Sequence, residues 1–340
     1  MNERAVSDRE LAGRFALIDL HLHLDGSLSL RTVRELASMQ CISVPESDHE
    51  LLGMLQVGPD CRDLNEYLEK FDFPCALLQT EAAITVAVRN LCRELEDQGL
   101  LYAEIRFAPQ LHTMQGLTQA EVVRAAVAGL RQCGLRANLI LCCMRGKQNH
   151  AENLETVSVA AEYLGRGVCA VDLAGAEALF PTEDFGELFS FAAERCVPFT
   201  IHAGEADGPE SVRTALGFGA RRIGHGVRSV EDETLLRRLA DEGITLELCP
   251  TSNLNTNIFE RIQDYPLPRL LDSGVRVTIN SDNLTVSNVS LRSELELICR
   301  TFSLSAWQAW QLARNAAEAS FADPETKAWL LEEIDGRFYG

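Results

Sequence analysis

Two histidines, His21 and His23, lie two positions apart at the end of an apolar run that begins at Phe15. The run is typical of a short buried strand. Side chains alternate between the two faces of a strand, so both imidazoles point to the same side. Two imidazoles on one face can bind a single metal ion. The alternative is a polar strand end with two unrelated histidines, and the metal interpretation gains support from later strands.

Three further residues fall at the ends of later predicted strands. His202 and His225 end two of them, and Asp282 follows the last one. His21, His23, His202 and Asp282 together form a set of three imidazoles and one carboxylate. This set suits zinc and leaves a coordination position open for water, although the ligand types alone also permit iron or manganese.

Glu205 and His225 are the candidates for acid and base chemistry. Glu205 follows His202 by three residues across Gly204, so it can reach the same centre without being a metal ligand. That position suits a general acid or base, although a glutamate on a surface loop would have the same sequence. His225 lies between two glycines, which leave the imidazole accessible. We expect a catalytic role for His225, and the alternative is a structural histidine bonded to a backbone carbonyl.

The number of metal ions can also be addressed from the sequence. Many two-metal barrels bridge their metals through a modified lysine at the end of the fourth strand. Here Asp172 ends the predicted fourth strand and no lysine lies near it. The sequence therefore favours one metal ion per chain.

The elements that must position these residues form a regular alternation of strands and helices. The predicted strands are Leu17–His21, Leu101–Phe107, Leu135–Cys143, Val168–Leu173, Pro198–His202, Arg222–His225, Ile244–Cys249 and Val275–Asn280. Such a pattern predicts an α/β fold with a parallel sheet covered by helices. Eight units favour a closed (β/α)8 TIM barrel, whose active site lies at the carboxyl ends of its strands. An open doubly wound sheet usually has a glycine-rich loop after its first strand, which is absent here.

We predict a single barrel domain over residues 1–340, because no linker or low-complexity segment divides the chain. Residues 44–80 interrupt the alternation with prolines, glycines and an amphipathic stretch, so they are predicted to form a helical insertion after the first strand. Helical segments after the last strand, from Ser305 to Glu333, are predicted to extend the barrel.

Composition excludes several classes of function. The chain has 340 residues, 46% of them hydrophobic, and a formal net charge of −19. That charge disfavours nucleic acid and anionic membranes as partners. The first residues are polar, and no apolar run approaches the roughly 18 residues that would suggest a membrane span. The 11 cysteines are scattered and form no CxxC pair, which favours reduced cysteines in a cytoplasmic protein.

Seven short motifs resemble those of the adenosine deaminase family within the metal-dependent amidohydrolase barrels. The similarity extends from Asp19 to about Phe321 and keeps the motifs in order. The motifs are His21-Leu-His23-Leu-Asp25-Gly26, Ala103-Glu-Ile-Arg-Phe-Ala-Pro109, Asp172-Leu-Ala-Gly175, His202-Ala-Gly-Glu205, Arg222-Ile-Gly-His225-Gly226, Cys249-Pro-Thr-Ser252-Asn253 and Asn280-Ser-Asp282-Asn283.

The resemblance implies a hydrolase of purine salvage that converts adenosine, and 2′-deoxyadenosine, to the inosine product and ammonia. It implies one zinc ion held by His21, His23, His202 and Asp282, with Glu205, His225 and Asp282 as catalytic residues. Glu205 would protonate N1 of the purine, and His225 would orient and help deprotonate the zinc-bound water before it adds to C6.

The resemblance also implies a set of substrate contacts. The Gly175 N–H would meet N3 of the purine, and Asp25 would meet the ribose hydroxyls. An apolar lid helix would cover the substrate, although an ordinary amphipathic helix packed on the barrel would have the same spacing. The expected substrate-binding residues are His23, Asp25, Gly175, Asn283, Leu64, Tyr67, Leu68 and Phe71.

One departure from the family pattern leaves the substrate less defined. The family often has two consecutive aspartates after the last strand, and here the second position is Asn283. Adenine, or another 6-aminopurine derivative such as aminodeoxyfutalosine, is the alternative substrate. A catalytically silent barrel that binds nucleosides is a further alternative, but it would have no need of Glu205 and His225 beside a metal. The sequence makes no prediction of the oligomeric state.

Overall fold

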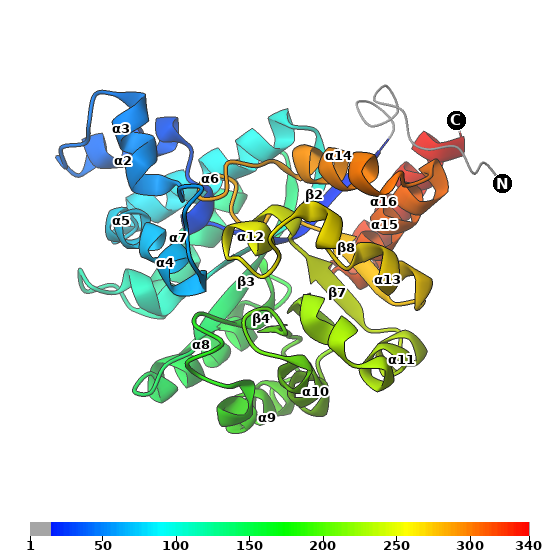
Figure 1. Cartoon of the computed structure of the whole chain (residues 1–340). Helices are drawn as coiled ribbons and strands as arrows, with labels where there is room; N and C mark the ends of the chain where they lie inside the picture. Colours follow the sequence, from blue (N-terminus) through cyan, green and yellow to red (C-terminus); the bar gives the residue numbers. More distant parts are fainter. Residues whose placement is uncertain (1–14, 340) are drawn as a thin grey trace.

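The computed structural model describes residues 15–339, and in this part of the chain eight strands alternate with helices (Figure 1). The strands are β1 (Leu17–His23), β2 (Leu100–Phe107), β3 (Arg136–Met144), β4 (Val168–Ala174), β5 (Thr200–Ala203), β6 (Arg222–His225), β7 (Thr245–Leu248) and β8 (Arg276–Ile279).

All neighbouring strands pair in parallel, in the order β1-β2-β3-β4 and β5-β6-β7-β8. Single parallel bridges join the two sheets at both seams. One bridge links Leu22 of β1 to Asp282 after β8, and the other links Val171 of β4 to Phe199 before β5. The architecture is the (β/α)8 barrel expected from the sequence.

The helices cover the outside of the strands and also form the insertion and the C-terminal extension. They are α2 (Leu30–Met39), α3 (Asp48–Leu55), α4 (Leu64–Leu68), α5 (Asp72–Leu77), α6 (Glu81–Asp97), α7 (Gln119–Leu130), α8 (His150–Tyr163), α9 (Gly186–Glu194), α10 (Pro209–Gly217), α11 (Glu233–Asp241), α12 (Pro250–Asn255), α13 (Leu267–Asp272), α14 (Leu291–Phe302), α15 (Ala306–Ala319) and α16 (Pro324–Tyr339). The short helices α3, α4 and α5 lie in the predicted insertion, and α15 and α16 form the predicted extension. No helix within residues 15–339 combines the length and apolar character needed to cross a bilayer.

Several strand ends differ from the prediction by a few residues. β1 continues to His23, because the His23 N–H donates to the Asp282 carbonyl at 2.7 Å across the seam. β5 begins at Thr200 instead of Pro198. Proline has no N–H to donate to a neighbouring strand, so it is a poor residue for a central ladder.

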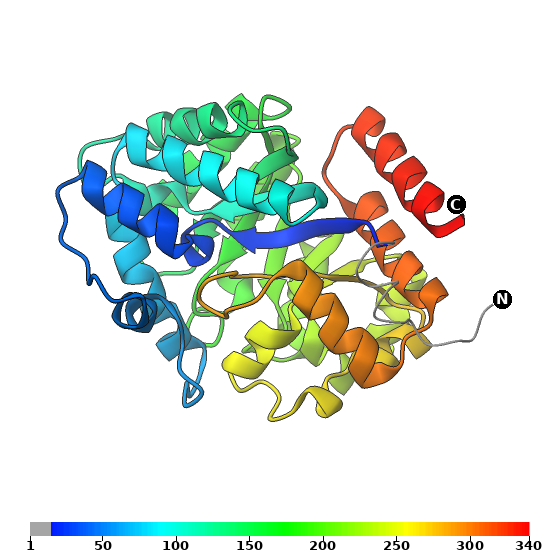
Figure 2. The ribbon, with the colours of Figure 1, turned by 90° about the horizontal axis from the view of Figure 1, so that it is seen from above.

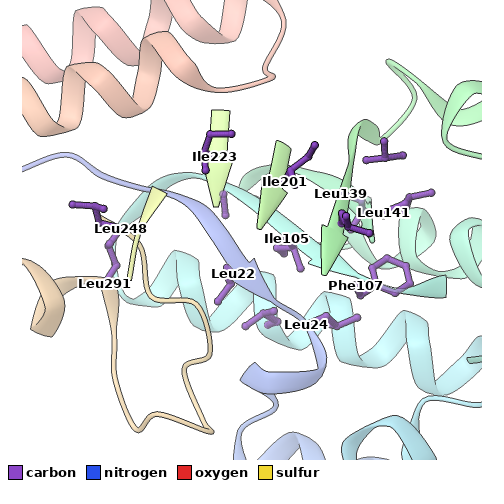
Figure 3. Packing of buried hydrophobic residues seen from close by; sticks show 14 of the residues in the cluster. Leu22, Leu24, Ile105, Phe107, Leu139, Leu141, Ile201, Ile223, Leu248 and Leu291 are labelled. Atoms are coloured by element: carbon purple, nitrogen blue, oxygen red, sulfur yellow. The ribbon is translucent and has the colours of Figure 1, made fainter. Parts of the chain in front are cut away.

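Alternation along the strands separates an apolar layer from a polar barrel interior. Leu22, Ile105, Leu139, Ile201 and Ile223 come from five strands and belong to the core between the strands and the helices (Figure 3). Seen from above, β1 runs through the middle of the molecule, with α6 on one side and α14 on the other (Figure 2). The side chains between these apolar positions point the other way, into the barrel.

The barrel interior contains a network of buried charges. Arg106 of β2 lies 2.9 Å from Asp172 of β4 and 2.8 Å from Glu247 of β7. Arg222 of β6 pairs with Glu247 at 2.7 Å and with Glu104 of β2. Burial would raise the pKa of Glu247, but Arg222 and Arg106 outweigh that effect and lower it well below its usual value. The paired carboxylates therefore remain charged beneath the carboxyl ends of the strands.

Candidate active site

The four proposed metal ligands meet at the carboxyl end of the barrel. His21 and His23 belong to β1, His202 belongs to β5, and Asp282 follows β8. His23 Nε2 lies 3.3 Å from His202 Nε2. Asp282 Oδ1 lies 3.4 Å from His21 Nε2 and 3.5 Å from His23 Nε2. The donor atoms of these residues thus come from three separate segments of the chain. The three imidazoles form one close group, and Asp282 contacts two of them.

These separations match the size of a metal site. Zinc–nitrogen and zinc–oxygen bonds of 2.0–2.2 Å in a tetrahedron place neighbouring donor atoms about 3.3–3.6 Å apart. His21 Nε2 is also buried without a hydrogen-bond partner in the protein. Three imidazoles and one carboxylate thus have donor atoms at these separations, and the Nε2 of His21 has no partner. A cation would satisfy such a set of donors.

In two of the proposed ligands, the second ring nitrogen lies close to a buried carboxylate. His21 Nδ1 lies 2.9 Å from Glu247 Oε2, and His202 Nδ1 lies 2.9 Å from Asp172 Oδ2. Burial would raise the pKa of Asp172, but His202 and Arg106 outweigh it and keep the pKa below its usual value. A carboxylate on Nδ1 directs the lone pair of Nε2 toward the metal position, which is the usual support of a ligating histidine.

A second grouping shares two of these residues and adds His225 and Cys249. Burial, with Asp282 and Asp19 nearby, raises the pKa of the Cys249 thiol well above its usual value. A neutral thiol is a poor metal ligand, because the thiolate is the form that binds. The set of His21, His23, His202 and Asp282 is therefore the better candidate.

Two site residues have unusual backbone conformations. His225 and Asp282 both have a φ of +60°, in the left-handed region that residues other than glycine seldom adopt. Such a conformation costs on the order of 1–3 kcal/mol per residue and persists where the surroundings enforce it. The strain lies at two of the positions that the sequence assigned to chemistry.

Glu205 is buried beside His225, with Oε2 3.6 Å from His225 Nε2. Burial raises the pKa of Glu205 well above its usual value, and the charges of Asp282 and Glu177 add to the effect. Burial also lowers the pKa of His225 well below its usual value. Burial therefore favours the protonated form of the Glu205 carboxyl and the neutral form of the His225 imidazole.

Asn253 of α12 connects these two groups. Its Nδ2 lies 3.1 Å from Glu205 Oε1 and 3.1 Å from His225 Nδ1, and its Oδ1 accepts a hydrogen bond from Tyr265. Because an amide nitrogen can only donate, His225 Nδ1 is the acceptor and the ring proton lies on Nε2.

A cavity of about 360 Å³ opens beside the ligand cluster, a size suited to a small organic molecule. Every predicted site residue except His21, which lies behind the others, lines this cavity. These lining residues are His23, Asp25, Leu64, Tyr67, Leu68, Phe71, Gly175, His202, Glu205, His225, Asp282 and Asn283. Among residues 15–339, no lysine or arginine lines it.

The predicted lid residues form the apolar side of the cavity. Leu64, Tyr67 and Leu68 belong to α4, and Phe71 follows in the same insertion. The Tyr67 hydroxyl lies 2.7 Å from the Ser287 hydroxyl in the segment after β8. This contact holds α4 against the barrel.

Three predicted substrate contacts have polar groups without a protein partner. Asp25 Oδ1 and Asn283 Oδ1 are buried and unpaired. Gly175 has a φ of +107°, and its N–H donates to no acceptor within residues 15–339. Burial raises the pKa of Asp25 to about 6. The Cys75 thiol, 3.6 Å from Oδ2, opposes this rise but does not cancel it. A substrate with donors and acceptors could satisfy the Asp25 and Gly175 groups, whereas Asn283 Oδ1 lies against Gly26.

Sequence reasoning missed several residues that support the site. Asn253 lay within a quoted motif but was given no role, and Glu177, Glu247 and Arg145 were not considered. Arg145 follows β3 and donates to the His202 carbonyl at 2.6 Å. Glu247 is an acidic residue within a buried strand, which is a signal that could have been used, whereas the partners of Glu177 become evident only in the fold.

Comparison with known proteins agrees with this geometry. A family model described as adenosine deaminase matches residues 17–337. An adenosine deaminase of Haemophilus ducreyi is 50% identical over 335 residues, covering 96% of this chain and 97% of that protein. The chain belongs to the adenosine deaminase family. An adenosine deaminase of Enterococcus faecalis is 38% identical and covers 94% of this chain and 95% of its own length.

The adenosine deaminase fold is also found in a solved structure. The crystal structure of an adenine deaminase from Arthrobacter aurescens superposes with a TM-score of 0.86 at 28% identity, covering 97% of this chain and 100% of that one. Membership in the adenosine deaminase family assigns the chain to the hydrolytic deamination of adenosine. The family and the ligand cluster together support a metal cofactor and a purine substrate.

Proposed function

We propose that this chain removes the 6-amino group of adenosine and 2′-deoxyadenosine with one zinc ion, held by His21, His23, His202 and Asp282. The observation that carries the proposal is the spacing of the donor atoms, 3.3–3.5 Å between Nε2 and Oδ1 atoms that come from three segments of the chain. A zinc ion in this position supplies Lewis-acid chemistry that activates a water molecule as the nucleophile.

Glu205 is the proposed proton donor to N1 of the purine. Protonation of N1 makes C6 more electrophilic and lets the ring accept the electron pair as water adds. A buried carboxyl whose pKa is raised suits this role, because a general acid works best when its pKa is shifted toward the operating pH. Water supplies the new oxygen on C6, the proton that it loses balances the one that the amino group gains, and ammonia leaves.

His225 is proposed to orient the attacking water. Its ring proton lies on Nε2 because Nδ1 accepts from Asn253, so Nε2 can donate a hydrogen bond and cannot accept a proton. This tautomer therefore supports the expected role of His225 in orienting the water. It does not support a role in deprotonating it. Asp282 is the carboxylate of the cluster, and its unusual φ directs it toward the ligand histidines.

The far side of the cavity is proposed to bind the nucleoside. The unpaired Oδ1 of Asp25 can accept a hydrogen bond from a ribose hydroxyl, and the Gly175 N–H can donate to N3 of the purine. The absence of basic side chains from the lining, within residues 15–339, disfavours a 5′-phosphate. The proposed substrate is thus a neutral nucleoside.

Adenine is the second candidate substrate, because an adenine deaminase has the same fold at 28% identity. The two can be separated by following the loss of substrate absorbance with zinc-loaded protein and adenosine, adenine or AMP. We expect rapid loss with adenosine only. Turnover of adenine or AMP in preference to adenosine would contradict the proposal.

An Asp25→Ala variant tests the contact to ribose. The variant should lower kcat/KM for adenosine by about 1.5–3 kcal/mol, which is the usual contribution of a hydrogen bond to a charged group. Any weak activity on adenine, which has no ribose, should not change. An equal loss on both substrates would assign Asp25 to the structure of the pocket.

A further inference from the structure

Glu177 lies two residues after Gly175, and its side chain is buried in the loop beyond β4. Its carboxylate accepts five hydrogen bonds, four from the segment between β5 and α10 and one from Ser211 in α10. Oε1 accepts from the Gly204 N–H at 2.7 Å and from the Ser211 hydroxyl at 2.6 Å. Oε2 accepts from the N–H groups of residues 205, 206 and 207 at 3.0, 2.8 and 3.0 Å.

Four consecutive backbone N–H groups therefore point at one carboxylate. Converging N–H groups of this kind form a concave site that usually binds an external anion. Here the anion is a side chain of the same protein. The turn also needs Gly204, which has a φ of +69° and where a Cβ would lie 2.5 Å from Val212 Cγ2. The conformation of residues 204–207 thus depends on Glu177 and on this glycine.

Glu205 is the second residue of this segment. From these contacts we propose that Glu177 is a positioning residue that holds Glu205 in place for proton transfer. The inference rests on the proposed function, in which Glu205 is the proton donor. Glu177 holds the backbone of Glu205, and Asn253 holds its side chain through Oε1 at 3.1 Å. The second carboxylate oxygen is left to face the cavity and His225.

Precise placement matters for this group because a general acid must lie within hydrogen-bond reach of the atom that it protonates. A purely structural role would be different, since loss of the five hydrogen bonds would then lower stability without a specific effect on turnover. Within residues 15–339, no hydrogen bond or ion pair joins the Glu177 side chain to the side chain of a proposed metal ligand. Its removal should therefore leave the metal in place.

The Glu177→Gln variant keeps the size of the side chain but replaces one acceptor oxygen by an NH₂ donor. The best amide orientation turns the oxygen toward residues 205–207 and the NH₂ toward Ser211, whose hydroxyl can accept. The Gly204 N–H then faces a donor and loses its partner. We expect kcat to fall roughly 10- to 100-fold, because a displacement of about 1 Å can cost on the order of 10²-fold in rate.

Two measurements on zinc-loaded Glu177→Gln protein accompany kcat. The KM for adenosine and the zinc content should stay near wild-type values, and amide hydrogen exchange should become faster at residues 204–207. Glu183→Gln is the matched control, because Glu183 is an exposed residue of the same loop and undergoes the same chemical change. It should leave all of these quantities unchanged. Loss of zinc in parallel with kcat in Glu177→Gln would overturn the proposal.

The decisive test combines Glu177→Gln with Glu205→Gln. If Glu177 acts through Glu205, the first substitution should have little further effect on kcat once the acid is removed. Additive losses would show that Glu177 acts by another route and would overturn the inference. If Glu177→Gln does not fold, Glu177→Asp keeps the charge with a shorter reach, and the same cycle applies with a smaller expected loss.

The exchange measurement separates this inference from the proposed function. Failure of the wild-type protein to deaminate adenosine would reject the proposed function, whatever residues 204–207 do. Unchanged exchange at residues 204–207 in Glu177→Gln would reject the anchoring by Glu177, even in a protein that turns over adenosine normally.

Discussion

Gly26 and Asn283 lie against each other at the seam between the first and last strands. A Cβ at position 26 would overlap the Asn283 amide oxygen. The Gly26 carbonyl also accepts hydrogen bonds from the N–H groups of Thr285 and Val286, at 3.0 and 3.1 Å. The glycine therefore makes room for the Asn283 side chain, which lines the cavity. Placement of Asn283 depends on a residue 257 positions earlier in the chain.

This relationship bears on recognition of purine N7. N7 is an acceptor, so its partner must donate, and an asparagine NH₂ donates at any working pH. We predict that 7-deazaadenosine, with C–H at this position, is handled worse than adenosine by about 1–3 kcal/mol in transition-state binding. The measurement is kcat/KM for both nucleosides.

Two variants test the same contact. Asn283→Ala should remove most of the discrimination between adenosine and 7-deazaadenosine. Gly26→Ala should have a similar effect, because the added methyl group displaces the Asn283 amide. Equal kcat/KM for both nucleosides with the unmodified protein would make Asn283 a structural residue.

The ligand cluster predicts about one zinc per chain. Elemental analysis of purified protein measures this directly, and His202→Ala should lower both zinc content and turnover because it removes one of four donors. His150→Ala, an exposed histidine on α8, is the matched control and should change neither quantity. Active protein that contains no metal, or two zinc ions per chain, would disprove the predicted site.

The proposed acid predicts that Glu205→Gln keeps its zinc and its fold but loses most of its turnover. Glutamine fills the same space and cannot transfer the proton, and a positioned acid contributes roughly 10²–10⁴-fold to the rate. Near-normal kcat would mean that another group is the acid.

The pH dependence of kcat follows from the direction of the Glu205 pKa shift. The reaction needs the protonated carboxyl, and burial raises its pKa well above the usual value. Turnover should therefore persist at pH values where an exposed glutamate would be ionised, and should fall as the pH rises through the raised pKa. Loss of turnover near pH 4.5 on raising the pH would contradict this assignment.

Leu64, Tyr67 and Phe71 line the cavity, which predicts that this segment acts as a lid over bound nucleoside. Hydrogen exchange of residues 64–71 should slow when a transition-state analogue binds, because closure excludes water. Tyr67→Phe removes one hydrogen bond and should weaken this protection while α4 remains in place. Exchange that does not respond to the analogue would indicate ordinary packing of α4.

Local sequence patterns were enough to predict the fold class and to place most residues of the candidate site. Side chains alternate along a strand, so the spacing of His21 and His23 places both on one face. The carboxyl ends of parallel strands share one edge of a barrel, which brings His202, His225 and Asp282 to the same place. These inferences need only local periodicity and the order of the elements.

The groups that support the site became evident only in the folded chain. Asn253, Glu177 and Glu247 reach their partners through contacts between residues 27 to 226 positions apart. Local periodicity carries no information on which carboxylate faces which histidine or which loop. The end of β1 also differs from the prediction, because a hydrogen bond from His23 to Asp282 extends the strand to His23. A buried polar group requires a hydrogen-bond partner. Which residue becomes that partner depends on how the whole barrel packs.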